Sequence, residues 1–183
     1  MASFATISAG SKPIHLYAFS GEVVDQQKSA YTEVTNTSNN QRQVSTTHYN
    51  DIFIRAADGS EKSIKIVDAS FSARQGSKAS IIWGIPGKKD QGPYLAVVNH
   101  DSGDLHMIRK AINDLASPPF YNMLLIVAAI FIAVGFFDMF NGSMMSAIIM
   151  AGIGGGLIYW IYSRQKAMMA KVREAALAFR PQG

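Results

Sequence analysis

The chain has 183 residues and no cysteine, and its residues are 48% hydrophobic and only 16% charged, against about 25% charged in an ordinary soluble domain. The lack of cysteine excludes a disulfide-stapled secreted fold, thiolate metal centres and a cysteine nucleophile. The net charge of +4 comes mainly from residues 164–183 rather than from a face of a folded domain, so the sequence predicts no nucleic-acid partner.

Residues 1–103 are expected to form a cytosolic domain of short antiparallel strands. Aromatic and β-branched residues recur between turn signals, and Asp58-Gly59 between two alternating runs predicts a tight hairpin. The polar segment 38–40 predicts another turn. The expected strands are residues 13–24, 30–37, 43–56, 61–67, 78–85 and 93–99. Closure into a small SH3-like or OB-like barrel would protect their edges, and an open sheet against a membrane-proximal helix is the alternative.

Residues 104–117 are predicted to form an amphipathic connecting helix. Apolar residues recur at helical spacing from Leu105 to Leu115, with polar residues between them. Pro118-Pro119 then ends the helix. We expect this segment either to cap the barrel or to lie on a membrane surface.

Two uncharged stretches predict a transmembrane hairpin over residues 118–163. Residues 120–137 and 144–162 contain no charged residue, and at about 1.5 Å per residue each spans roughly 27–29 Å, close to the hydrocarbon thickness of a bilayer. The short link between them contains an Asn-Gly turn, so the two helices should be antiparallel neighbours. The predicted fold class is therefore an α+β membrane protein, with a β-barrel-like domain, a two-helix hairpin and a short basic C-terminal helix.

The flanks of the hairpin predict its orientation. Lys and Arg lie at its two outer ends and are missing from its link, so by the positive-inside rule both termini are cytoplasmic in a bacterial-type inner (plasma) membrane. The first residues lack the pattern of a signal peptide, which agrees with a cytosolic domain. The predicted membrane-interface residues are Tyr121, Tyr159, Trp160, Tyr162, Arg164 and Lys166.

Small residues predict how the spans pack, because helices associate in lipid where small side chains let their backbones approach. In the second span one stripe recurs every four residues, and an adjacent stripe has the GxxxG pattern. The predicted packing or oligomerisation residues are Ala129, Ala133, Ala147, Ala151, Gly152, Gly155 and Gly156. One stripe can hold the hairpin together and the other can bind a second copy, with packing inside the hairpin alone as the alternative.

Residues 164–183 form a basic tail that is expected to continue the second span as a helix. Met168, Val172 and Phe179 share an apolar face of that helix. Basic groups near anionic headgroups contribute about 1 kcal/mol each, so membrane lipid is a predicted partner. A solvated overhang is the alternative for this tail.

No motif for phosphate-loop, zinc-protease or serine-hydrolase chemistry occurs in the sequence. Residues of the types that bind metals cluster in the sequence only at His100, Asp101, Asp104 and His106. They lie in a Ser-Gly turn, and a polar turn of this kind contains such residue types by chance, without a metal. We therefore predict no catalytic, cofactor-binding or metal-binding residue.

The β-rich part contains the runs GEVV, DIFIRAADGSEKSIKI, RQGSKASIIWG and VVNHDSG, and a hairpin anchor follows them. This order of parts resembles bacterial inner-membrane proteins that carry a small cytosolic β-domain, and it implies no residue-level function. The leading hypothesis is a non-enzymatic membrane protein whose β-domain binds a protein partner in a secretion, conjugation, exclusion or envelope system. The alternatives are a homo-oligomeric channel or transporter subunit assembled through the Gly-rich second span, and an enzyme or ligand sensor that uses the His100–His106 turn.

Overall fold

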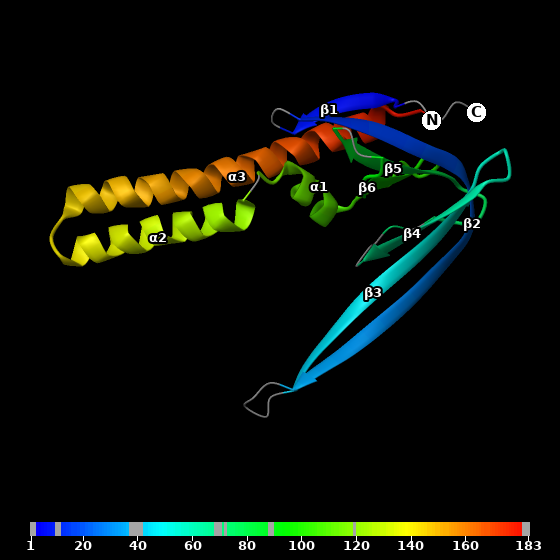
Figure 1. The fold of residues 1–183 in the computed structure, drawn as a ribbon. Helices are drawn as coiled ribbons and strands as arrows, with labels where there is room; N and C mark the ends of the chain where they lie inside the picture. The colour runs from blue at the N-terminus through cyan, green and yellow to red at the C-terminus, as the bar shows by residue number, and fades with distance from the viewer. Residues whose placement is uncertain are drawn as a thin grey trace.

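The structure is a computed structural model, and it describes residues 3–9, 12–36, 42–67, 71, 73–87, 90–118 and 120–180. Within these residues, strands precede helices along the chain (Figure 1). The strands are β1 (Ala5–Ala9), β2 (Lys12–Asn36), β3 (Arg42–Arg55), β4 (Glu61–Val67), β5 (Lys78–Pro86), β6 (Tyr94–Asn99) and β7 (Leu105–Met107). The helices are α1 (Arg109–Ala116), α2 (Tyr121–Phe140) and α3 (Met144–Ala178).

All described strands belong to one antiparallel sheet. Its order is β4-β3-β2-β5-β6-β7, and β1 pairs with the first residues of β2. No pairing among the described strands joins β4 to β7, so the predicted antiparallel sheet is confirmed while its closure into a barrel is not shown.

β2 is one continuous strand of 25 residues, where the sequence predicted two strands. The polar residues 25–29 do not interrupt it, because they pair with β3 where side chains are largely exposed. β2 is bent (Figure 1), and the backbone of β3 approaches it closely at Gly21, where a Cβ would come 2.1 Å from the Arg55 carbonyl oxygen. The register with β3 also shifts between Val23 and Asp25, as expected of a bulge at a bend.

The outer halves of β2 and β3 form a two-stranded arm that projects from the rest of the sheet (Figure 1). We define the arm as residues 25–36 and 42–50. The ladder with β5 ends at Glu22, and the ladder with β4 begins at Tyr49. Beyond those points the two strands pair only with each other among the described strands. The predicted turn at 38–40 lies outside the described residues.

The sheet buries apolar side chains on both of its faces. On one face, Ile64 and Ile66 of β4 share a cluster with Ile81 of β5 and Val97 of β6. Strands far apart in the sheet order meet there, so the sheet folds over itself. The opposite face of β5 and β6 packs against α1 and α3, which fixes the helices to the sheet.

The predicted helix over 104–117 begins later than expected, at Arg109, because residues 105–107 form the short strand β7. Gly103 has φ +74°, and this allows the chain to turn back so that His106 pairs with Val97. Three residues are too few for an alternation of apolar and polar side chains to distinguish a strand from the start of a helix. The sequence pattern could not separate the two at this point.

The two longest helices form an antiparallel hairpin that extends away from the sheet (Figure 1). α2 has 20 residues and covers the first predicted span. α3 has 35 residues, or about 50 Å at the usual rise, and it contains both the second predicted span and the predicted helical tail. The expected helical continuation beyond Ser163 is therefore confirmed.

Candidate functional site

The α2–α3 hairpin presents apolar side chains over most of its outer surface. Both helices are long and apolar enough to cross a membrane, judged by length and composition. Only 11% of the most apolar window of α2 and 17% of that of α3 is buried, whereas a core helix of a soluble protein would be mostly buried. Exposed residues such as Ile126, Phe137, Met145 and Ile149 cover a surface far better suited to lipid than to water.

Two glycines bring the helices of the hairpin into close contact. A Cβ on Gly135 would lie 2.9 Å from the Ala147 carbonyl oxygen and 3.0 Å from the Ala151 nitrogen. A Cβ on Gly154 would lie 2.7 Å from the Ala128 carbonyl oxygen. The backbones therefore approach at these points because neither glycine carries a side chain.

The predicted packing residues divide into two groups. Ala147 and Ala151 lie beside α2, while Ala129 and Ala133 lie on the exposed side of α2. A Cβ would meet nothing within 4 Å at Gly152, Gly155 or Gly156, so that stripe faces open space in the single chain. The sequence prediction omitted Gly135 and Gly154, although Gly135 is the single glycine of the first span and marks a close approach.

The predicted interface residues gather at the sheet-proximal end of the hairpin. Since the helices are antiparallel, Tyr121 at the start of α2 lies at the level reached by α3 after its first 18 or so residues. The Arg164 guanidinium carbon lies 5.0 Å from the centre of the Trp160 ring, a cation–π contact. The predicted set at this end is Tyr121, Tyr159, Trp160, Tyr162, Arg164 and Lys166, and all of these except the half-buried Tyr121 and Arg164 are exposed.

The second half of α3 packs on the sheet, whereas we expected from the sequence that this tail lies on a membrane or is exposed to solvent. Met168, Val172 and Ala176 are buried against β2, β5, β6 and α1. The Lys171 ammonium nitrogen lies 3.1 Å from the Ser8 carbonyl oxygen of β1. One helix therefore carries both the apolar hairpin surface and the attachment to the sheet.

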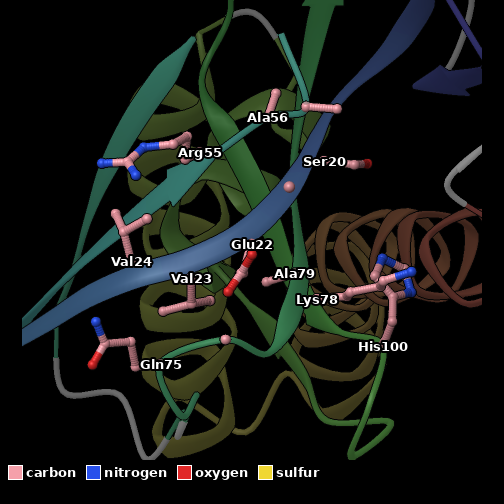
Figure 2. A pocket seen from close by; sticks show the side chains of 13 residues that line it. Ser20, Glu22, Val23, Val24, Arg55, Ala56, Gln75, Lys78, Ala79 and His100 are labelled. Carbon is pink, nitrogen blue, oxygen red and sulfur yellow. The ribbon is translucent and has the colours of Figure 1, made fainter. Parts of the chain in front are cut away.

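A cleft of about 580 Å³ lies at the bend of β2 (Figure 2). Arg55 lies on one side of β2, and Lys78 and His100 lie on the other side near α3 (Figure 2). Arg55 forms an ion pair with Glu61 at 2.6 Å. The remaining charged lining groups, Glu22 and Lys78, have opposite signs, so the cleft presents no single-sign surface to a ligand.

Beside this cleft a line of side-chain hydrogen bonds connects β2, β5 and the turn after β6. The Ser20 and Ser80 hydroxyl oxygens are 2.7 Å apart, and Ser80 Oγ is 2.7 Å from His100 Nε2. Burial lowers the pKa of His100 below its usual value, and the Arg180 guanidinium lowers it further while Asp101 acts against them. A neutral His100 can accept a hydrogen bond from the Ser80 hydroxyl at Nε2, which satisfies a fully buried hydroxyl.

The His100–His106 turn has a structural arrangement in this fold. The Asp101 carboxylate accepts a hydrogen bond from the Lys78 backbone nitrogen at 3.0 Å and so ties the turn to β5. His106 lies on β7, where burial first and Arg109 second lower its pKa. Among the described residues no group of three His, Cys, Asp or Glu side chains converges in a way that could hold a metal ion.

Comparison with known protein families, curated proteins and solved structures gives no match for this chain.

Proposed function

We propose that this chain is a non-enzymatic inner-membrane protein whose cytosolic β-domain binds a protein partner, as an accessory or regulatory subunit of a larger membrane assembly. In this proposal α2 and α3 cross the bilayer and both termini are cytoplasmic. The Lys and Arg residues at the sheet-proximal end of the hairpin support that orientation.

The observation that carries the proposal is the division of α3 into two halves. Its first half is exposed and apolar, while its second half is buried by the sheet at Met168 and Val172. An uninterrupted helix joins the two halves. The β-domain is thereby held at a fixed height above the bilayer, as expected of a protein that presents a binding surface to neighbours.

The arm is the surface that we assign to the partner. Tyr31, Val34 and Val44 expose 61%, 55% and 60% of their surface on it. Among the described strands, none pairs with the outer edge of β2 over residues 25–36, and such an edge attracts an added strand from another protein. A partner segment in extended conformation would cover that edge and the apolar side chains together.

Site-specific photo-cross-linking in the native host tests this assignment. A photoreactive amino acid at Tyr31 or at Val34 should give an adduct with the same protein, because edge docking brings the partner close to both faces of the arm. The matched control is exposed Asp114 on α1, which should give no such adduct. Adducts absent from both arm positions, or equally strong at Asp114, would contradict the proposal.

A homo-oligomeric channel or transporter subunit is the second candidate, and the open stripe at Gly152, Gly155 and Gly156 favours it. Replacing Gly152 and Gly156 by leucine should then reduce the native mass in mild detergent to that of a monomer. It should also abolish conductance in reconstituted bilayers. An unchanged mass and the absence of conductance in the native protein would rule this candidate out.

A further inference from the structure

A small groove is lined by residues of β1, α1 and α3. These three elements come together just beyond the apolar part of the hairpin (Figure 1). The volume of the groove is about 190 Å³, below the 300–1,000 Å³ typical of sites for drug-sized ligands. The groove has room for one small polar group. Its lining includes Ser8, Ala116, Trp160, Arg164, Met168 and Lys171.

The charge of the groove has one sign. Arg164 and Lys171 both line it, and none of its described lining residues is Asp or Glu. The two cations form no salt bridge within 4.0 Å to a carboxylate in the part of the chain that the structure describes. Within the described ranges, the hydrogen bonds of Lys171 go to the carbonyl and hydroxyl oxygens of Ser8, at 3.1 and 3.2 Å. An ammonium has three donors and Ser8 takes two of them, so Lys171 keeps one donor for an anion.

The position of the groove indicates the source of that anion. Trp160 is 44% exposed and lies under the Arg164 guanidinium, four residues before it on α3. Helical side chains lean toward the helix N-terminus, and the N-terminus of α3 lies in the proposed bilayer. Arg164 and Lys171 therefore lean toward the level where Trp side chains and lipid phosphates occur.

We propose that this groove binds the phosphodiester of an anionic glycerophospholipid. Arg164 and Lys171 would hold the phosphate oxygens by charge-assisted hydrogen bonds, and Trp160 would pack against the glycerol end of the lipid. The bound lipid would seal the junction between the bilayer and the β-domain. This inference rests on the membrane placement in the proposed function.

Quenching of Trp160 fluorescence by a brominated lipid tests the proposal. The sequence has two tryptophans, so Trp83→Phe in the full chain leaves Trp160 as the single emitter. The protein is reconstituted in phosphatidylcholine vesicles with rising fractions of brominated phosphatidylglycerol. We expect half-maximal quenching at a phosphatidylglycerol fraction about tenfold lower than in the double variant Arg164→Gln, Lys171→Gln.

The control is Lys166→Gln, Arg173→Gln, which removes the same two charges from the same helix outside the groove. It should stay within about twofold of the parent, and Arg164→Lys, Lys171→Arg should keep the preference. Equal shifts in both glutamine variants would overturn the proposal, since they would mean diffuse charge attraction. Reversal by millimolar inorganic phosphate would also overturn it, in favour of a soluble ligand.

A flotation assay distinguishes a failure of the membrane placement from a failure of the lipid site. If the protein fails to float with phosphatidylcholine vesicles, the membrane placement and the lipid site both fail. If it floats but the groove variants match the control, only the lipid site fails. Circular dichroism of each variant checks that the fold is retained.

Discussion

Alanine at Gly154 should weaken the hairpin, whereas alanine at Gly152, only two residues away, should not. A Cβ at Gly154 would lie 2.7 Å from the Ala128 carbonyl oxygen and 2.7 Å from Ile132 Cγ1. Carbon contacts are optimal at about 3.5–4.0 Å, so the helices must move apart. Overpacking of this kind costs about 1–3 kcal/mol. A Cβ at Gly152 would meet nothing within 4 Å.

The two substitutions share the same gain in helix propensity, about 1 kcal/mol from glycine to alanine, so their difference isolates the contact. The assay is unfolding of the purified protein in mixed micelles of mild detergent and SDS, followed by circular dichroism. Gly154→Ala should unfold at lower SDS fraction than Gly152→Ala, by about 1–3 kcal/mol in free energy. Equal midpoints would refute the reasoning, and a loss confined to Gly152→Ala would instead point to a contact with a second copy.

Three further outcomes concern the β-domain. Ile81→Ala should lower the free energy of unfolding by about 2–5 kcal/mol in chemical denaturation, because Ile81 is fully buried; a loss below 1 kcal/mol would contradict the cluster. Gly21→Ala should cost about 3 kcal/mol or abolish folding, since its Cβ would overlap the facing backbone, and a thermal shift assay that finds no change would exclude this close approach. The lowered pKa of His100, due first to burial and then to Arg180, means that the unfolded chain binds more protons below about pH 6.5. Stability should therefore be full above that pH and fall as the pH drops, and denaturant midpoints for His100→Gln should show a weaker fall than the native chain.

The sequence predicted those elements whose pattern is local. Two uncharged runs identified both long helices, and Asp58-Gly59 identified a hairpin that the structure confirms with Gly59 at φ +83°. The helical tail was also predicted, but the surface that covers its apolar face was not. Met168 and Val172 form a stripe that lipid or a sheet could cover equally well, and only the tertiary structure shows the sheet.

Other elements were missed because their residues carry no distinctive pattern. β1 is five residues of mixed character, and its pairing with β2 depends on contacts that a single sequence does not show. The polar residues 25–29 indicated a break between two strands. A strand whose side chains are largely exposed, however, needs no alternation of apolar and polar residues. The small groove is lined by residues of β1, α1 and α3, so no single segment of the sequence could predict it.

The continuity of α3 has a mechanical consequence. No glycine or proline occurs between Leu157 and Ala178, so the helix has no hinge where it leaves the hairpin. From Ser163 to Ala178 it forms a lever about 22 Å long. A change in helix tilt of about 10°, within the range by which helices adapt to bilayer thickness, would swing its far end by about 4 Å. In the membrane placement that we propose, local thinning or thickening of the bilayer would therefore reorient the β-domain as a rigid body.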